Sequence, residues 1–223
     1  MLEQILEELK PYGARLVAVS KTKPDEAILD LYNRGHRIFG ENKVQELVGK
    51  YERLPKDIEW HMIGRLQTNK VKYIVPFVSM IHSVDSLKLL REIDKRAGRV
   101  ETLKPTGVDC LLQYHICTEE TKHGMNEQES EELLKAIKET PLQRVRICGV
   151  MGMATFTDDM DLVRQEFRNL KKQFDYLKEN HFAGQEHFRE ISMGMSGDYK
   201  VALEEGSTLV RIGTLLFGAR QYT

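Results

Sequence analysis

RLVAVSKTKPDEAILDLYNRG, residues 15–35, joins a short apolar run to a longer amphipathic one. Residues 15–21 have the length and the β-branched content of a buried strand. Pro24 and the two acidic residues after it favour the start of a helix, because proline suits the first turn and carboxylates suit its positive end. The stretch therefore predicts a strand followed by a helix.

The same alternation recurs along the chain eight times. The expected strands are Arg15–Lys21, Arg37–Glu41, Glu59–Gly64, Met80–Val84, Val108–Ile116, Arg146–Met151, Phe188–Met193 and Leu209–Phe217. Strands that alternate with helices pair in parallel, and closing eight of them into a barrel removes both sheet edges. With no linker or repeat in sight, we expect an α/β fold, a single-domain (β/α)8 TIM barrel over residues 1–223, with an open doubly wound sheet as the alternative.

The composition argues against several classes of partner. The chain has 33 basic and 34 acidic side chains and a net charge of −1, so it has no global attraction for nucleic acid or for an anionic membrane. No apolar stretch reaches the roughly 20 residues of a membrane helix. Three cysteines without metal-site spacing indicate free thiols in a reducing compartment. We expect a cytoplasmic protein, either a monomer or a weak dimer.

Lys21 ends the first expected strand, at the barrel face where TIM-barrel active sites lie. Val17, Val19 and Lys21 alternate along this strand and should point inward. A partly desolvated lysine becomes neutral and nucleophilic more readily, which imine formation with an aldehyde requires. An isolated lysine that reaches solvent is the alternative.

Two further clusters of candidate binding residues lie near the end of the chain. One follows the expected seventh strand, and the other lies on the expected eighth strand. Ser196 lies in SMGMSGD, residues 192–198, and Arg211, Gly213 and Thr214 lie in LVRIGT, residues 209–214. A phosphate site built after strands seven and eight recurs in these barrels. Arg211 could instead form a structural ion pair across the barrel.

Three histidines, His61, His82 and His115, lie on expected strands. A histidine cluster could bind zinc, but no His-x-His pair and no matching carboxylate accompany them. Scattered histidines of the core or the surface are the preferred interpretation, and we predict no metal site.

Motifs across almost the whole chain resemble those of the pyridoxal phosphate homeostasis proteins, single-domain relatives of the N-terminal barrel of alanine racemase. The matching stretches, in order, are AVSKTKP (18–24), FGENKVQE (39–46), WHMIGRLQTNK (60–70), HSVD (82–85), SMGMSGD (192–198) and VRIGTLLFG (210–218).

The resemblance implies that the chain binds pyridoxal 5′-phosphate (PLP). It implies an internal aldimine on Lys21, a phosphate cradle of Ser196, Gly213 and Thr214, and Arg211 against the pyridine nitrogen. Asn42 is implied as a further pocket residue, and Lys23 and Lys122 as nearby alternative amines. Arg65 and Lys43 depart from the family pattern, which implies changes only at the pocket rim.

The function that we expect is PLP homeostasis without catalysis, with apo forms of PLP enzymes as recipients of the cofactor. An arginine beside the ring nitrogen disfavours its protonation and restrains carbanion chemistry. The alternative is a weak amino-acid racemase in which Tyr199, Tyr114 or a lysine supplies a second base. A Schiff-base aldolase or a sugar-phosphate isomerase is a more distant alternative, in which Lys21 attacks a substrate carbonyl.

Overall fold

The computed structural model describes residues 1–101, 107–118 and 123–218. In chain order its elements are α1 (Leu2–Leu9), the 3₁₀ helix η1 (Lys10–Tyr12), β1 (Arg15–Val19), α2 (Asp25–Asn33), β2 (Ile38–Glu41), α3 (Val44–Arg53), β3 (Glu59–Met62), the 3₁₀ helix η2 (Thr68–Lys70), α4 (Val71–Ile74), β4 (Met80–Val84), α5 (Leu87–Ala97), β5 (Val108–Gln113), α6 (Glu127–Glu139), β6 (Val145–Met151), α7 (Met160–Asn180), β7 (Glu190–Ser192), α8 (Tyr199–Glu204), β8 (Leu209–Ile212) and α9 (Thr214–Phe217).

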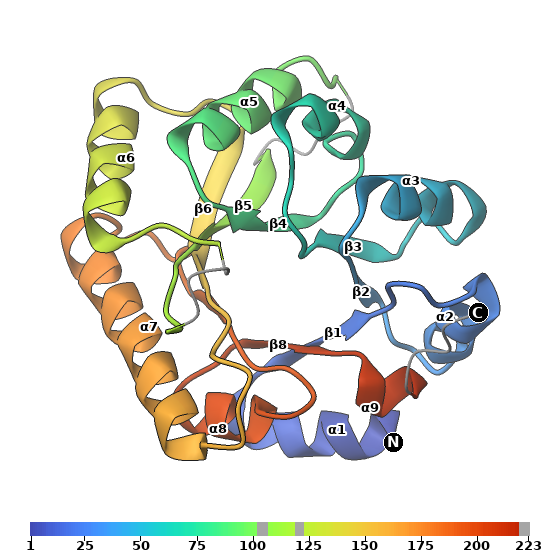
Figure 1. Ribbon diagram of the computed structural model, residues 1–223. Coiled ribbons are helices and arrows are strands. Elements are labelled where there is room, and N and C mark those ends of the chain that lie inside the picture. The colour runs from blue at the N-terminus through green and yellow to red at the C-terminus, as the bar shows by residue number, and fades with distance from the viewer. Residues whose placement is uncertain (102–106, 119–122, 219–223) are drawn as a thin grey trace.

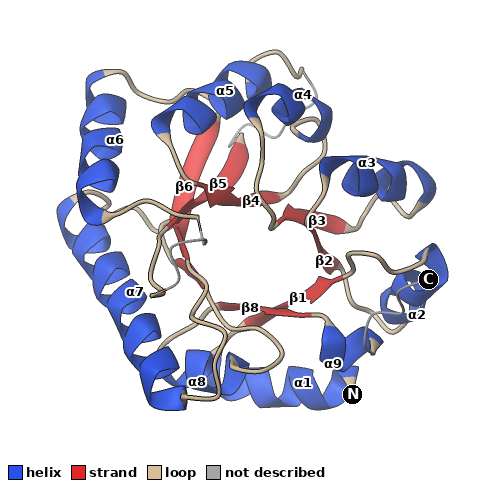
Figure 2. Cartoon of the chain, in the orientation of Figure 1, coloured by secondary structure: helices blue, strands red, loops and turns tan. Residues whose placement is uncertain are grey.

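The eight strands form a closed parallel barrel in the order β1 to β8, and β8 pairs with β1. Figure 1 looks into the barrel, and Figure 2 shows the ring of strands enclosed by helices. The expected TIM-barrel fold is therefore confirmed. At the closing seam, Arg15 lies opposite Leu209 and Val17 lies opposite Arg211.

Side chains alternate between two hydrophobic clusters, as the period of a strand requires. Val17 and Leu209 belong to a small cluster inside the barrel, whereas Leu16, Ala18 and Val210 pack between the strands and the surrounding helices. The inward direction expected for Val17 is thus confirmed. Because Arg211 is two residues from Leu209, it also faces the barrel interior.

The three longest helices each combine a buried apolar stripe with a side-chain cap. In α7, the buried stripe consists of Val163, Glu166, Phe167, Leu170, Phe174 and Leu177. Ser86 accepts a hydrogen bond from the Leu89 amide and caps α5. Asn126 and Glu129 form a capping box at the start of α6.

The expected last strand, Leu209–Phe217, is too long. β8 ends at Ile212, and residues 214–217 form the short helix α9, in which the Phe217 amide donates to the Gly213 carbonyl. Beyond Ile212, β8 has no neighbour to pair with, because β1 ends at Val19 and the chain turns at Ser20. Strands one, three, five and seven likewise end before the expected Lys21, Gly64, Ile116 and Met193.

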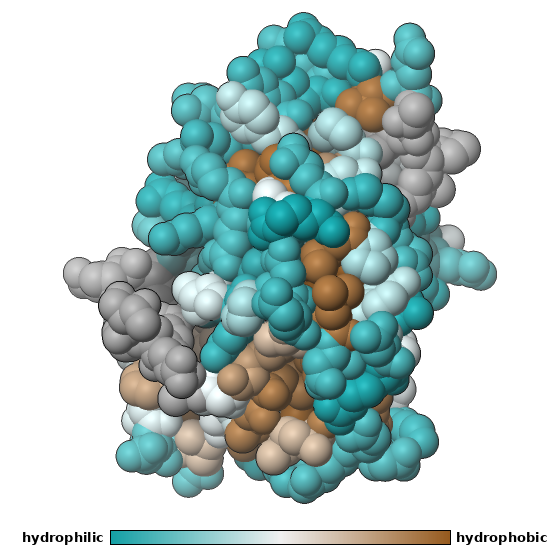
Figure 3. Space-filling model, turned by 90° about the vertical axis from the view of Figure 1, so that its right-hand side faces the viewer, coloured by the Kyte–Doolittle hydropathy of each residue, from teal (hydrophilic) through white to brown (hydrophobic). Residues whose placement is uncertain are grey.

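The outer surface is mostly polar. Figure 3 shows the side that lies to the right in Figure 1, where hydrophilic residues dominate and hydrophobic ones gather in the lower half. α1 and α8 lie side by side, joined by a hydrogen bond from the Tyr199 hydroxyl to Glu8. Within the described ranges, no helix has the length and apolarity needed to cross a membrane.

Candidate functional site

A cavity of about 470 Å³ opens where the carboxyl ends of the strands meet. Its walls come from β1 and β8 and from the segments after β1, β2, β3, β6, β7 and β8. All six residues that the sequence singled out for cofactor binding line it, namely Lys21, Asn42, Ser196, Arg211, Gly213 and Thr214. Residues far apart in the chain are thus brought together at the barrel face expected for a TIM-barrel site.

Lys21 lies in a tight turn beyond β1. The Lys23 amide donates to the Ser20 carbonyl at 3.0 Å, which closes the turn around Lys21 and Thr22. Lys23 also lines the cavity, but its ammonium donates to the carbonyls of Phe217 and Gly218 at 3.0 and 3.2 Å. These contacts tie the turn to α9. Lys122, the other alternative amine, lies outside the described residues.

Arg211 reaches the cavity from inside the barrel and is only 4% exposed. Its guanidinium donates to the Ser192 hydroxyl at 2.6 Å and to the Gly152 carbonyl at 3.0 Å. Burial lowers the pKa of Arg211 to about 10, which leaves the side chain charged at neutral pH. No carboxylate lies within salt-bridge distance of it among the described residues, so the ion pair weighed for Arg211 is not found there.

A buried hydrogen-bond chain continues from Arg211 into the barrel. The Ser192 hydroxyl lies 2.9 Å from Nδ1 of His82, and Nε2 of His82 lies 2.9 Å from Nδ1 of His61. An arginine can only donate, so the Ser192 hydroxyl accepts from Arg211 while it also contacts His82. Burial holds His82 in its neutral form, and the tautomers of the two rings decide which of them donates in the His61–His82 contact.

The interpretation of these histidines as scattered was therefore wrong for His61 and His82. They form a pair because β3 and β4 are neighbours and both side chains are buried. No group of three or more metal-binding side chains is found within residues 1–101, 107–118 and 123–218.

The neutral state of His82 gives a pH prediction. Burial first, then the charges of His61 and Arg211, hold the pKa of His82 well below its usual value. The unfolded chain therefore binds a proton below pH ~6.5 that the folded protein excludes, and stability falls with decreasing pH at up to ~1.4 kcal/mol per unit. The free energy of unfolding can be measured by urea denaturation at several pH values between about 5 and 7.5. Its dependence on pH should be weaker in His82→Gln than in the wild-type protein. Equal slopes in the two proteins would contradict a neutral, buried His82.

The segments that follow β7 and β8 give the cavity a surplus of hydrogen-bond donors. The backbone amides of Ser196, Gly197, Gly213 and Thr214 find no acceptor within the part of the chain that the structure describes. Gly194, with φ of +95°, lets this wall approach α8, since a Cβ there would lie 2.6 Å from that of Ala202. Unpaired amides and a hydroxyl suit an anionic group.

Asn42 lies between β2 and α3, half-buried at the rim of the cavity. Gly64 packs against its backbone so closely that a Cβ would lie 2.4 Å from the Asn42 carbonyl oxygen. Lys43 and Arg65, the two departures from the family pattern, are exposed and do not line the cavity. Arg65 instead lies 3.2 Å from a ring nitrogen of His123.

Sequence reasoning missed the loop between β6 and α7, which supplies residues 153–158 to the cavity. Glu166, buried in α7, holds this loop by accepting from the Thr155 amide and hydroxyl at 2.7 Å each. It also accepts from the Thr118 amide at 3.2 Å. The signal was present, because an acidic residue sits within the apolar stripe of α7. Phe156, next to Thr155, is 93% exposed at the mouth.

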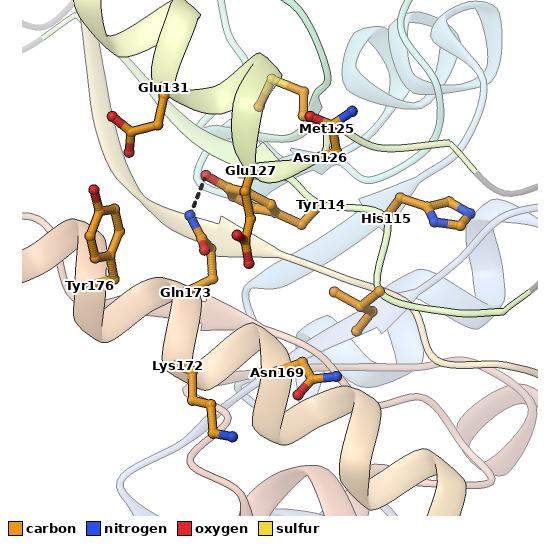
Figure 4. Close-up of a pocket in the computed structure, with 11 residues that line it drawn as sticks. Tyr114, His115, Met125, Asn126, Glu127, Glu131, Asn169, Lys172, Gln173 and Tyr176 are labelled. Atoms are coloured by element: carbon orange, nitrogen blue, oxygen red, sulfur yellow. Dashed lines mark hydrogen bonds between the residues drawn. The ribbon is translucent and has the colours of Figure 1, made fainter.

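Neither tyrosine considered as a second base lines the cavity. Tyr199 donates to Glu8 at 2.5 Å, and burial raises its pKa to about 12. Tyr114 lines a separate hollow of about 690 Å³ between α6 and α7, where Gln173 donates to its hydroxyl at 3.4 Å (Figure 4). Burial also raises the pKa of Tyr114.

Comparison with known proteins gives consistent similarities. Residues 2–221 match the family model "Alanine racemase, N-terminal domain". The pyridoxal phosphate homeostasis protein of Aquifex aeolicus is 44% identical over 210 residues, covering 94% of this chain and 88% of that protein. The Escherichia coli protein of the same name is 37% identical over 219 residues, covering 96% and 88%.

Two solved structures of PipY from Synechococcus elongatus share the fold. The structure without PLP has a TM-score of 0.88 and 34% identity, and the one with PLP bound has a TM-score of 0.84 and 33% identity. Both alignments cover 97% of this chain and 98% of PipY. Alanine racemase from Bartonella henselae, at 16% identity and a TM-score of 0.68, is similar in fold over 57% of its length.

Proposed function

This chain belongs to the alanine racemase N-terminal domain family and, within it, to the pyridoxal phosphate homeostasis proteins, and from that premise we propose that it binds PLP to buffer and deliver the cofactor. The observation that supports this most strongly is the gathering of Lys21, Asn42, Ser196, Arg211, Gly213 and Thr214 around one cavity. PipY, which shares the fold over nearly its whole length, has PLP bound in one of its structures.

The lining of the cavity fits the chemical groups of PLP. The unpaired amides near Ser196 and Thr214 suit the phosphate, and the charged Arg211 suits the ring nitrogen. Lys21 would supply the amine that condenses with the aldehyde of PLP, with the aldehyde oxygen lost as water. Asn42 adds a polar group at the rim. A bound aldehyde held in this way is protected from side reactions with other amines.

We propose storage and delivery rather than catalysis. Racemisation needs a base on each side of the substrate, and the hydroxyls of Tyr114 and Tyr199 are engaged away from the cavity with Ser130 and Glu8. Arg211 keeps a positive charge beside the ring, which disfavours protonation of the pyridine nitrogen. The recipients would be apo forms of PLP enzymes, and three buried free thiols suit a cytoplasmic site of action.

Two assays on the same PLP-loaded protein separate storage from catalysis. One follows the recovery of activity of an apo PLP enzyme, with an equal concentration of free PLP as the reference. The other follows conversion of L-alanine to D-alanine. We expect cofactor transfer to the recipient and racemisation no faster than with free PLP. Alanine turnover far above the free cofactor would favour a racemase, and a failure to bind PLP would exclude both functions.

A further inference from the structure

A triad of charged side chains lies behind the turn that carries Lys21. Lys50 of α3 lies 2.7 Å from Glu41 of β2 and 2.7 Å from Glu46, one turn earlier in α3. The side chains of Lys50 and Glu41 are 4% and 0% exposed. None of the three lines the cavity, so the triad has no direct part in holding a cofactor.

The triad is hydrogen-bonded to both residues that flank Lys21 in the turn. The Lys50 ammonium donates to the Ser20 carbonyl at 2.7 Å, and the Ser20 hydroxyl donates to Glu41 at 2.6 Å. The Thr22 amide donates to Glu46 at 2.6 Å. All three ammonium protons of Lys50 are used, by the Ser20 carbonyl and the two carboxylates.

The turn needs such support because its backbone is strained. Thr22 has a φ of +64°, and it is the one non-glycine residue with positive φ within the described part of the chain. A β-branched residue rarely adopts this conformation, and a turn of this shape normally has glycine at that position. Strained residues persist where the surrounding structure holds them, often at functional sites.

Stability alone is a weak reason to bury Lys50 and Glu41 here. A buried ion pair commonly contributes little, because removing its charges from water offsets their attraction, and well-packed apolar residues often serve as well. A buried network does, however, fix geometry. The groups that this network fixes are the two peptide units on either side of Lys21.

We propose that Lys50 is a positioning residue for Lys21. Together with Glu41 and Glu46, it holds the turn Ser20–Lys23 in the conformation that directs the Lys21 side chain into the cavity. The role in cofactor binding rests on the proposed function, whereas the hold on the turn does not.

The test compares Lys50→Met with the wild-type protein. Methionine keeps the apolar part of the side chain and removes its three hydrogen bonds. Without cofactor, hydrogen exchange at the Thr22 amide should accelerate at least about tenfold, because Glu46 loses the ammonium that orients it. With PLP, the Kd should rise about tenfold or more.

Arg53→Met is the matched control, because Arg53 lies on the same helix and pairs with Asp25 without touching the turn. It should leave both measurements unchanged. In the Lys50→Met background, Thr22→Gly should recover part of the PLP affinity, because glycine adopts positive φ without strain. Recovery of this kind is not expected if Lys50 only stabilises the fold as a whole.

Unchanged exchange at Thr22 together with an unchanged Kd would overturn the proposal. A second outcome would also overturn it: Lys50→Met loses affinity for PLP, Thr22→Gly does not restore any of that affinity, and hydrogen exchange accelerates throughout the barrel. If Lys50→Met does not fold, Glu46→Ala removes the acceptor of the Thr22 amide at a partly exposed position, and the same outcomes apply. A wild-type protein that fails to bind PLP would refute the proposed function but leave the exchange test intact.

Discussion

Lys21→Ala is expected to bind PLP about 100-fold more weakly than the wild-type protein and to yield no borohydride-trappable adduct. The phosphate and ring contacts would remain, but the covalent link would be lost, and 100-fold corresponds to ~2.7 kcal/mol. The fold should be unaffected, because Lys21 is half-buried in a turn beyond the end of β1. Equilibrium dialysis and denaturant unfolding of the two proteins measure both quantities.

Lys43→Ala is the control for this experiment. Lys43 immediately precedes α3, beside Asn42, but it is exposed and does not line the cavity. Its removal should change neither affinity nor trapping. Wild-type affinity and trapping in Lys21→Ala would show that the covalent bond forms elsewhere.

Arg211→Met is expected to weaken PLP binding strongly while it changes the stability of the folded protein only a little. The lowered pKa of Arg211 means that burying this charge costs the folded protein free energy. Methionine removes that cost but leaves the Ser192 hydroxyl and the Gly152 carbonyl without their donor. These effects oppose each other, so the free energy of unfolding of the apo protein should change by less than ~2 kcal/mol.

Binding of PLP by the same variant should weaken by about 10- to 100-fold, the ~1.5–3 kcal/mol of one charged hydrogen bond. The bound pyridine nitrogen should also protonate at higher pH, since no cation then opposes it. Arg211→Lys keeps the charge but lacks the planar fork of donors of a guanidinium, and its affinity should fall in between. An Arg211→Met protein with wild-type affinity would contradict a ring-binding role for Arg211.

The sequence predicted the barrel well because the barrel depends on local patterns. Apolar runs of strand length and amphipathic helices can each be recognised from side-chain periodicity. With eight strand–helix units, closing the sheet into a barrel is the simplest arrangement. The lining residues could also be placed, since inward positions alternate along a strand. Val17 and Arg211, opposite each other across the β1–β8 seam, are both where parity puts them.

Strand ends were predicted less well because they depend on neighbours. Whether residues 214–217 continue β8 is decided by where β1 stops, and the sequence of β8 does not contain that information. The same limit applies to His61 and His82, because their contact depends on the register between β3 and β4.

Charged residues that support the site were the hardest to find. Lys50 and Glu166 occupy positions within the apolar stripes of their helices, and the structure buries both. Each pairs with polar groups of a loop at the carboxyl ends of the strands, namely the turn after β1 and the loop after β6. Periodicity indicates that these two positions are buried, but it does not indicate which distant loop each side chain contacts.

Borohydride reduction of the PLP-loaded wild-type protein, followed by peptide mapping, locates the covalent bond directly. Reduction converts the imine to a stable secondary amine, so the modified lysine survives proteolysis and can be identified by mass. We expect the pyridoxyl group on Lys21 alone. A pyridoxyl group on Lys23, on Lys122 or on any other lysine, or no modification at all, would contradict the proposal that Lys21 holds the cofactor.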